Sequence, residues 1–350
     1  MKEKIYETFD ELLSDLTSRE KDVFLKRLGL EDKRYSLEDI GKQYDLTRER
    51  IRQIQNEAVN KLQRKILVHP FLKKEFYHII ESHLGKLKIK RYHYLKIKFQ
   101  DSYSLDEQSL KILRALLKIH PLIYFFNENE IYNEFVYLKE NDFNNLNKFT
   151  HHILNFLDSQ SVISENQFFE FLRLEIKNHF GLLLNIDEIL EFVKLYKVIA
   201  QNPFNEFGHI ANWRINPNSL IDKINLILEL EGKPLSYYQI HQKLIELSQV
   251  EKDLIHYSWR KSYSLKTVHS TLNSNKDFIL VGRGIYALRK WGVIEGKIID
   301  IMKKIVKENS GLTISELYQK LSQERIFNKN SFYVYLNKYF KVINKRVYLK

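Results

Sequence analysis

"SLEDIGKQYDLTRERIRQIQNEAVNKLQRK", residues 36–65, is the stretch that decides the fold of the first domain. Ser36 is placed to cap a helix, with Asp39 three residues later at the position of the capping-box acid. A short helix and a turn fit before Thr47, which is placed to cap the next helix. The pattern therefore predicts two helices joined by a tight turn.

The second of these helices has two different faces. Apolar residues that recur at helical spacing are expected to face inward: Ile51, Ile54, Ala58 and Leu62. The opposite, solvent-facing stripe consists of Arg48, Glu49, Arg52, Gln53 and Asn56. Arginine and glutamine carry donors and acceptors that match purine edges in the major groove, and glutamate can accept from cytosine. Since the start of the second helix of a helix-turn-helix reaches those edges, the stripe is expected to contact duplex DNA.

The surrounding sequence extends this pattern in both directions. "LTSREKDVFLKRLGLEDKRYSLEDIGKQYDLTRERIRQIQNEAVNKLQRK" resembles region 4 of housekeeping-class bacterial sigma factors, through its "LTxRE" opening, its "RLGL" and its "LTRERIRQI" core. The resemblance covers about residues 11–67. It implies a four-helix domain whose last helix reads the promoter −35 element and whose flank contacts the β-flap of RNA polymerase.

The resemblance also implies roles for individual residues. It implies that the base edges are read by Arg48, Glu49 and Gln53. It implies that phosphate or supporting contacts are made by Arg50 and Arg52. Further contacts with the DNA backbone, near the helix start, would be made by Thr47 and Lys42. The motif begins almost at the first residue, without the upstream region with which the family clamps polymerase and melts DNA. We therefore expect a protein that is not a complete sigma factor.

The C-terminal half repeats one layout. Three times a helix-rich stretch ends in a short β-like segment, at residues 197–213, 277–291 and 340–350. In the last two, apolar β-formers flank a tight turn at "GRG" or "NKR", which indicates a hairpin. Helices followed by a two-stranded hairpin are the layout of a winged helix. Such units bind DNA or other proteins, and the pattern leaves both open.

The middle of these three units carries a second resemblance. "INLILELEGKPLSYYQIHQKL" followed by "VHSTLNSNKDFILVGRGIYALRKW", within residues 220–292, looks like the HARE-HTH winged-helix family. That family includes a domain of the RNA polymerase delta subunit and domains fused to restriction and DNA-modification proteins. Arg283, at the expected hairpin tip, is the candidate phosphate contact, and a solvent-exposed turn arginine is the alternative.

Composition narrows the classes of function. The 350 residues carry a net charge of +12, which favours a polyanionic partner such as nucleic acid. The chain has no cysteine, no secretory signal and no apolar run long enough to span a bilayer, so we expect a cytoplasmic, nucleoid-associated protein without membrane contact. Neither a phosphate-binding loop nor a catalytic arrangement is recognisable, and the adjacent His151 and His152 lack ligands at a known spacing. No enzymatic activity, cofactor or metal is expected.

Together these patterns predict a mainly α, multi-domain protein. The expected parts are a sigma-region-4-like four-helix domain at 1–68, a helical linker at 69–160, a further winged-helix candidate at 161–216, a HARE-HTH-like winged helix at 217–292 and a C-terminal winged helix at 293–350. Hence two or three winged helices with short β-hairpins follow the N-terminal domain.

The expected function is that of a sequence-specific transcription regulator that binds double-stranded DNA. Two alternatives stay open. One is an RNA polymerase accessory protein that docks on the flap of the core enzyme and modulates initiation. The other is the DNA-targeting subunit of a defence or modification system. The target sequence, the sign of regulation and the oligomeric state do not follow from the sequence.

Overall fold

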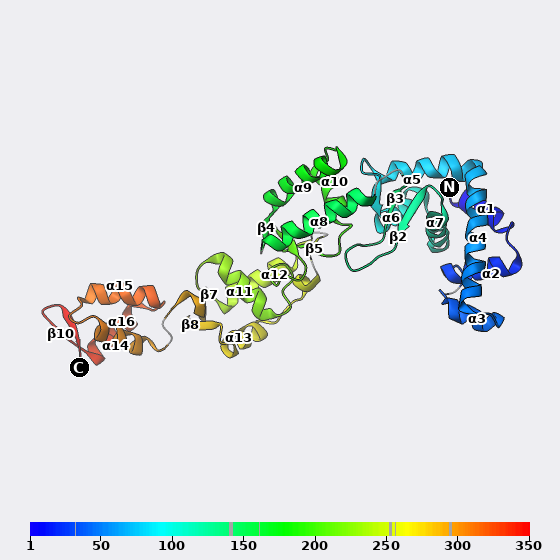
Figure 1. Ribbon diagram of the computed structural model, residues 1–350. Coiled ribbons are helices and arrows are strands. Elements are labelled where there is room, and N and C mark those ends of the chain that lie inside the picture. The colour runs from blue at the N-terminus through cyan, green and yellow to red at the C-terminus, as the bar shows by residue number, and fades with distance from the viewer. Residues whose placement is uncertain (32, 140–142, 161, 252–253, 256, 294–295) are drawn as a thin grey trace. The chain divides into compact units, whose positions relative to one another are not determined.

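The computed structural model describes residues 1–350 except 32, 140–142, 161, 252–253, 256 and 294–295. Helices dominate it, and small antiparallel sheets accompany them (Figure 1). The chain divides into two compact units, residues 1–199 and residues 200–350. The expected mainly α-helical character is confirmed, while the finer five-part division stays a prediction.

The first unit begins with four helices: α1 (Lys2–Leu13), α2 (Ser18–Leu28), α3 (Leu37–Tyr44) and α4 (Arg48–Val68). The predicted caps are confirmed. Ser36 and Asp39 form a reciprocal capping box at the start of α3, and Thr47 Oγ1 accepts a hydrogen bond from the backbone N–H of Arg50 at the start of α4. These caps satisfy N–H groups that a helix start leaves without intrahelical partners.

Helix α4 belongs to two hydrophobic cores. Its first half contributes Ile51 and Ile54 to a small core with Val23 of α2 and Ile40 of α3. Its second half contributes Ala58, Leu62 and Ile66 to the large core of the unit, which also includes side chains of α1 and of residues 71–138. The inward face predicted for this helix is therefore confirmed, and the helix joins the helix-turn-helix to the rest of the unit.

The segment expected to be a helical linker, 69–160, also contains a sheet. It holds the π-helical segment η1 (Phe71–Phe76), α5 (Tyr77–Leu84), β1 (Ile89–Arg91), α6 (Tyr92–Tyr103), α7 (Glu107–Ile119), β2 (Ile123–Phe126), β3 (Phe135–Leu138) and α8 (Phe143–Ser159). The three strands pair antiparallel in the order β1-β3-β2. Strands β2 and β3 are short runs of aromatic and β-branched residues, which favour a pleated surface.

The rest of the chain continues with helices and short strands. After α8 come β4 (Ile163–Ser164), α9 (Glu165–Phe180), α10 (Ile186–Val193), β5 (Ile199–Gln201) and β6 (Glu206–His209). Next come α11 (Leu220–Glu231), β7 (Leu235–Ser236), α12 (Tyr237–Ser248), the 3-10 helix η2 (Tyr257–Arg260), α13 (Leu265–Ser274), β8 (Phe278–Gly282), β9 (Ile285–Leu288) and the 3-10 helix η3 (Arg289–Trp291). The last elements are α14 (Ile298–Glu308), α15 (Ile314–Glu324), α16 (Lys329–Tyr339), β10 (Phe340–Ile343) and β11 (Arg346–Leu349).

One order of elements recurs four times along the chain. Helix, strand, two helices and two strands follow one another in α5-β1-α6-α7-β2-β3, in α8-β4-α9-α10-β5-β6 and in α11-β7-α12-α13-β8-β9. The fourth set, α14-α15-α16-β10-β11, has a single bridge between Thr313 and Arg346 in place of the first strand. In the first and third sets the last strand lies in the centre of the sheet. The sequence indicated three such sets, and the structure adds one that begins at α5.

The two hairpins expected from their turns are confirmed. Strands β8 and β9 are joined across Arg283 and Gly284, and Gly284 has a φ of +69°. Strands β10 and β11 are joined across Asn344 and Lys345, which both have positive φ, as a type I′ turn requires. Both hairpins pack on helices of their own sets, in two separate cores.

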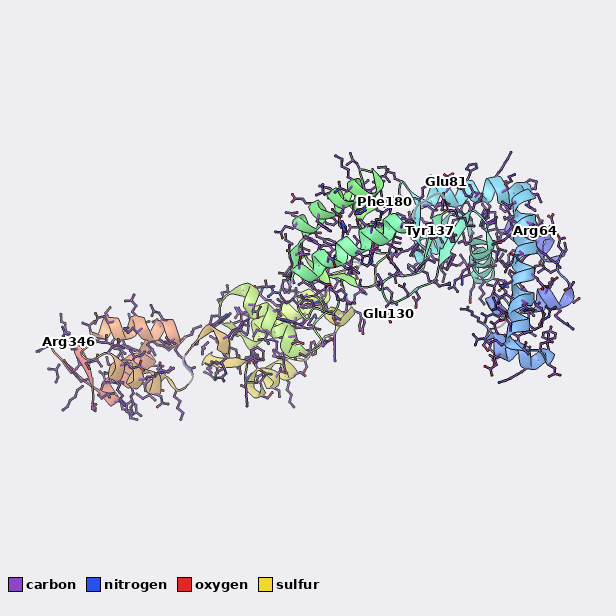
Figure 2. The ribbon with its side chains drawn as sticks, in the orientation of Figure 1. Arg64, Glu81, Glu130, Tyr137, Phe180 and Arg346 are labelled. Carbon is purple, nitrogen blue, oxygen red and sulfur yellow. The ribbon has the colours of Figure 1, made fainter. Side chains whose placement is uncertain are left out.

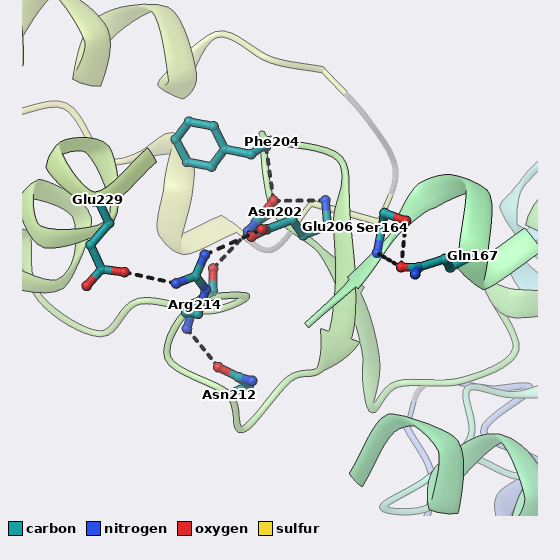
Figure 3. Close-up of polar contacts among 8 residues, drawn as sticks. All are labelled: Ser164, Gln167, Asn202, Phe204, Glu206, Asn212, Arg214 and Glu229. Atoms are coloured by element: carbon teal, nitrogen blue, oxygen red, sulfur yellow. Dashed lines mark hydrogen bonds and ion pairs between the residues drawn. The ribbon is translucent and has the colours of Figure 1, made fainter. Parts of the chain in front are cut away.

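A polar cluster fastens β6 to α11 in the second unit (Figure 3). The Arg214 guanidinium lies 3.4 Å from the carboxylate of Glu206 on β6 and 2.9 Å from that of Glu229 on α11. The buried Asn202 donates from its side-chain amide to Glu206 Oε2 and to the carbonyl oxygen of Arg214. Since each partner is largely removed from water, the cluster links the end of the second set to the start of the third.

Candidate nucleic-acid interface

The start of α4 presents the polar stripe that the sequence predicts. Every member of the predicted stripe is exposed, and so are Arg50 and Thr47. Arg48 is the first helical residue, and no hydrogen bond or ion pair of its side chain occurs among the described residues. The guanidinium of Arg48 is therefore available to a ligand without breaking a protein contact.

Two other arginines of the stripe are already paired within the helix. Arg52 donates from Nε and Nη2 to the two carboxylate oxygens of Glu49, at 2.8 and 2.6 Å. Arg50 Nη1 donates to Gln53 Oε1 at 3.0 Å and lies 3.7 Å from Glu57 Oε1. The hydrogen bond from Arg52 lowers the pKa of Glu49 and the same bond raises the pKa of Arg52. These pairs are more than half exposed, so they cost little to open when a partner arrives.

The turn before α4 depends on a close backbone approach at Gly41. The N–H of Leu46 donates to the carbonyl oxygen of Gly41 at 2.9 Å. A Cβ on Gly41 would lie 2.6 Å from the carbonyl oxygen of Leu46, which is shorter than a van der Waals contact. Asp45 ends α3 in the left-handed conformation, with a φ of 54°. Glycine at 41 therefore sets how closely α3 and α4 meet.

Contacts from α2 hold this helix-turn-helix in place. Arg27 donates from Nε to Gln55 Oε1 at 3.1 Å and from Nη1 to the carbonyl oxygen of Tyr35 at 2.6 Å. Tyr44 OH donates to Asp22 Oδ2 at 2.7 Å, which anchors the end of α3. Burial lowers the pKa of Arg27. Sequence reasoning did not find these supporting residues, because their partners lie 8 to 28 positions away and follow no helical spacing.

The second half of α4 is tied to α2 and α1 by lysines. Lys61 Nζ lies 2.8 and 2.9 Å from the two carboxylate oxygens of Glu20, whose own pKa is lowered by this contact. Lys65 Nζ donates to the carbonyl oxygen of Glu11 on α1 at 2.6 Å and lies 2.8 Å from Asp15 Oδ1, just after that helix. The lysines on this part of the helix therefore serve the fold, while the arginines at its start face solvent.

The remaining predicted residues lie on other elements. Lys42 is on α3 and pairs with Glu38 at 3.2 Å, both strongly exposed. Arg283 is exposed at the tip of the β8–β9 hairpin, in the second unit. The structure thus brings Thr47, Arg48, Glu49, Arg50, Arg52 and Gln53 together on two turns of one helix. Their contacts with DNA stay predictions.

Comparison with known proteins identifies this part of the chain. Residues 12–64 match the family model of sigma-70, region 4. This match contains α2, α3, the turn at Gly41 and the exposed start of α4. The resemblance inferred from the sequence is confirmed for the N-terminal segment, whereas the HARE-HTH resemblance of residues 220–292 stays a prediction.

The curated relatives with similar sequence are RNA polymerase sigma factors. The chain is 47% identical over 76 residues to an RNA polymerase sigma-C factor of Nostoc sp., over 21% of this chain and 18% of that protein. It is 53% identical over 57 residues to the RNA polymerase sigma factor SigA of Lactococcus lactis subsp. cremoris, over 16% of each protein. It is 37% identical over 84 residues to the RNA polymerase sigma factor RpoD of Neisseria gonorrhoeae, over 24% of this chain and 12% of that protein. The chain spans less than a fifth of the length of these relatives.

None of the helices in the described part of the chain combines the length and the apolar character needed to cross a membrane.

A group of possible metal ligands lies away from the region-4 segment. His152, Glu175 and His179 place three atoms with metal-ligand chemistry within 4.8 Å of one another. Sequence reasoning did not find this group, since its members come from two helices.

Proposed function

We propose that the protein is a transcription regulator that binds double-stranded DNA sequence-specifically, and that it reads the major groove with the Arg48–Gln53 part of α4. The observation that carries this proposal is the exposed, arginine-rich start of α4 inside a segment that matches sigma-70, region 4. Arg48 is suited to a bidentate contact with guanine, and Gln53 to a contact with adenine. Backbone N–H groups at the same helix start suit a phosphate.

The four recurring sets are proposed to be winged helices that add further contacts. The fourth set supports a phosphate-binding role, because residues 328–350 contain six lysines and arginines and no aspartate or glutamate. Lys329, Lys338, Lys341 and Lys345 are exposed there, as is Arg346 (Figure 2). The third set, proposed to be HARE-HTH-like, offers Arg283 at its hairpin tip. Affinity would come mainly from such phosphate contacts and specificity from α4.

The test is a selection of bound duplexes from a random pool, carried out with the full chain. The wild type is compared with the double variant Arg48→Ala/Gln53→Ala and with Arg64→Ala. Arg64 is exposed on the same helix, 16 residues after Arg48 (Figure 2), and has no hydrogen bond or ion pair among the described residues, so its replacement removes the same charge outside the proposed reading surface.

We expect a short enriched motif with the wild type and with Arg64→Ala, and none with the double variant. Binding that stays intact in all three proteins without any enriched motif would reject sequence reading by α4. In that case the basic surface would bind DNA without sequence preference.

A second candidate is an RNA polymerase accessory protein, with the region-4-like segment docked on the flap of the core enzyme. It is favoured by the names of the matched relatives, which are RNA polymerase sigma factors. A pull-down with core polymerase in nuclease-treated extract distinguishes the two, because a DNA reader needs no such contact. A DNA-targeting subunit of a defence or modification system is the third candidate, and it predicts instead a stable complex with a nuclease or methyltransferase.

A further inference from the structure

Three side chains from two neighbouring helices converge on one point in the first unit. His152 lies on α8, while Glu175 and His179 lie one turn apart on α9. His152 Nδ1 is 2.7 Å from Glu175 Oε2, and His179 Nε2 is 3.3 Å from the same oxygen. The two imidazole rings stand nearly perpendicular, with their centroids 4.9 Å apart. One carboxylate oxygen thus lies between two imidazole nitrogens.

The packing of α8 against α9 fixes this arrangement. Phe156 of α8 stacks on Phe171 of α9 with their centroids 3.9 Å apart, which sets the register of the two helices. The fully buried Phe149 meets the ring of His179 edge-on at 6.1 Å. The convergence is therefore a consequence of the helix packing, and it does not depend on mobile surface side chains alone.

The cluster is open to solvent on one side only. The side chains of Glu175 and His179 are 12% and 14% exposed, whereas that of His152 is 55% exposed. An ion can therefore enter from the side of His152 and keep a water molecule there. The aromatic side chains behind the cluster exclude water from its inner face.

We propose that His152 Nδ1, Glu175 Oε2 and His179 Nε2 bind a divalent first-row transition ion, best Zn²⁺, with water as the fourth ligand. Two imidazoles and one carboxylate are an established three-ligand set for zinc, at bond lengths of about 2.0–2.2 Å. Ligand atoms of a tetrahedral site of that size lie about 3.3–3.6 Å apart. The 3.3 Å between His179 Nε2 and Glu175 Oε2 already fits this spacing. The 2.7 Å between His152 Nδ1 and the same oxygen must lengthen by less than 1 Å.

The choice of ion follows from the ligand types. Ca²⁺ and Mg²⁺ prefer oxygen ligands only, while imidazole suits zinc, copper and nickel. Each histidine binds as a neutral ring, with its proton on the other ring nitrogen, so the ion replaces the direct contacts of both rings with Glu175. The bound ion would cross-link α8 and α9. This role is independent of DNA reading by α4.

The test is a calorimetric titration of the chelator-treated full chain with ZnCl₂, together with visible absorption after addition of Co²⁺. We expect one ion per chain and cobalt bands of a tetrahedral site. His152→Asn and Glu175→Gln are each expected to weaken zinc binding at least tenfold. His151→Asn is the matched control, since His151 is the adjacent, exposed histidine outside the cluster, and it should bind zinc as the wild type does.

Thermal unfolding distinguishes loss of the site from loss of the fold. Zinc should raise the melting temperature of the wild type and of His151→Asn but not that of His152→Asn, whose metal-free melting temperature should stay close to the wild-type value. Absence of stoichiometric zinc binding by the wild type would overturn the proposal. An equal loss of binding in His151→Asn and His152→Asn would also overturn it.

Discussion

Arg52 and Glu49 form a two-pronged ion pair on the solvent face of α4, with both guanidinium–carboxylate distances below 3 Å. Both residues belong to the stripe expected to contact DNA, and in the free protein the two side chains are paired with each other. The pair shields the negative charge of Glu49 and holds the Arg52 guanidinium beside the helix. Arg48, one residue before Glu49, has no such partner.

Removing Glu49 should therefore strengthen general DNA binding and weaken discrimination. In Glu49→Gln the carboxylate no longer holds Arg52, so Arg52 can reach a phosphate, and one repulsive charge is lost. We expect tighter binding to random duplexes and a slope of log K against log salt that is steeper by about one unit. Binding measured between low and moderate salt checks this, and an unchanged slope would show that Arg52 does not reach the backbone.

Arg48→Ala should reduce specific binding by about 1–3 kcal/mol and relax the preference at one or two base pairs, because the alanine cannot pair with a base edge. Competition binding on the selected site and on single-base variants of it measures both effects. Arg64→Ala serves as the charge-matched control. Equal losses on specific and random duplexes would contradict a base-reading role.

Gly41→Ala should destabilise the helix-turn-helix. The added methyl group would lie 2.6 Å from the Leu46 carbonyl oxygen, and the turn must open to relieve this contact. We expect a cost of about 1–3 kcal/mol, as for other overpacked sites, and a loss of specific DNA binding. Hydrogen exchange at α3 and α4 locates the effect. Asn60→Ala, on the exposed side of α4, should leave both properties unchanged.

The stability of the second unit should depend on Lys223 at alkaline pH. Its side chain is almost fully buried beside the Trp259 ring, and burial lowers its pKa to about 8, against about 10.4 in an unfolded chain. Between these two values the unfolded state binds more protons than the folded state, so stability attributable to this group rises with pH. Below pH 8 that gain is absent.

Melting temperatures at pH 7.5 and pH 10 test this dependence. The wild type should lose less stability, or gain more, than Lys223→Met across this interval, because methionine has nothing to deprotonate. The comparison with Lys223→Met removes the contributions of the tyrosines that titrate in the same range. A wild-type and a variant curve that stay parallel would contradict the lowered pKa.

Local signals in the sequence were the ones that predicted structure well. The capping roles of Ser36 and Thr47, the buried positions of Ile51 and Ile54, and the Asn344–Lys345 turn each depend on residues within one helical turn or one hairpin. Their energetics are decided by neighbours in the chain, so the sequence is enough to recognise them.

The features that sequence reasoning missed depend on partners far apart in the chain. Strand β1 has its partner β3 more than forty residues away, and its three residues are too few for a periodic signal. The basic, aromatic stretch after Arg91 forms α6, because it packs a helical face into the large core. Arg27 and Gln55, like His152 and Glu175, meet only through tertiary packing.

Helix α4 contains neither glycine nor proline between Arg48 and Val68, and 21 residues of α-helix are about 31 Å long. Kinks in helices arise mostly at such residues, so we expect this helix to be straight and rigid. Its two halves are held in separate cores, and the direction in which the Arg48 end of α4 points is therefore set by side chains several turns away. A fragment cut at Val68 would leave Leu62 and Ile66 without the partners they have beyond that point. Transplanting the helix-turn-helix into another protein would therefore require moving the large core around Leu62 and Ile66 together with the exposed start of α4.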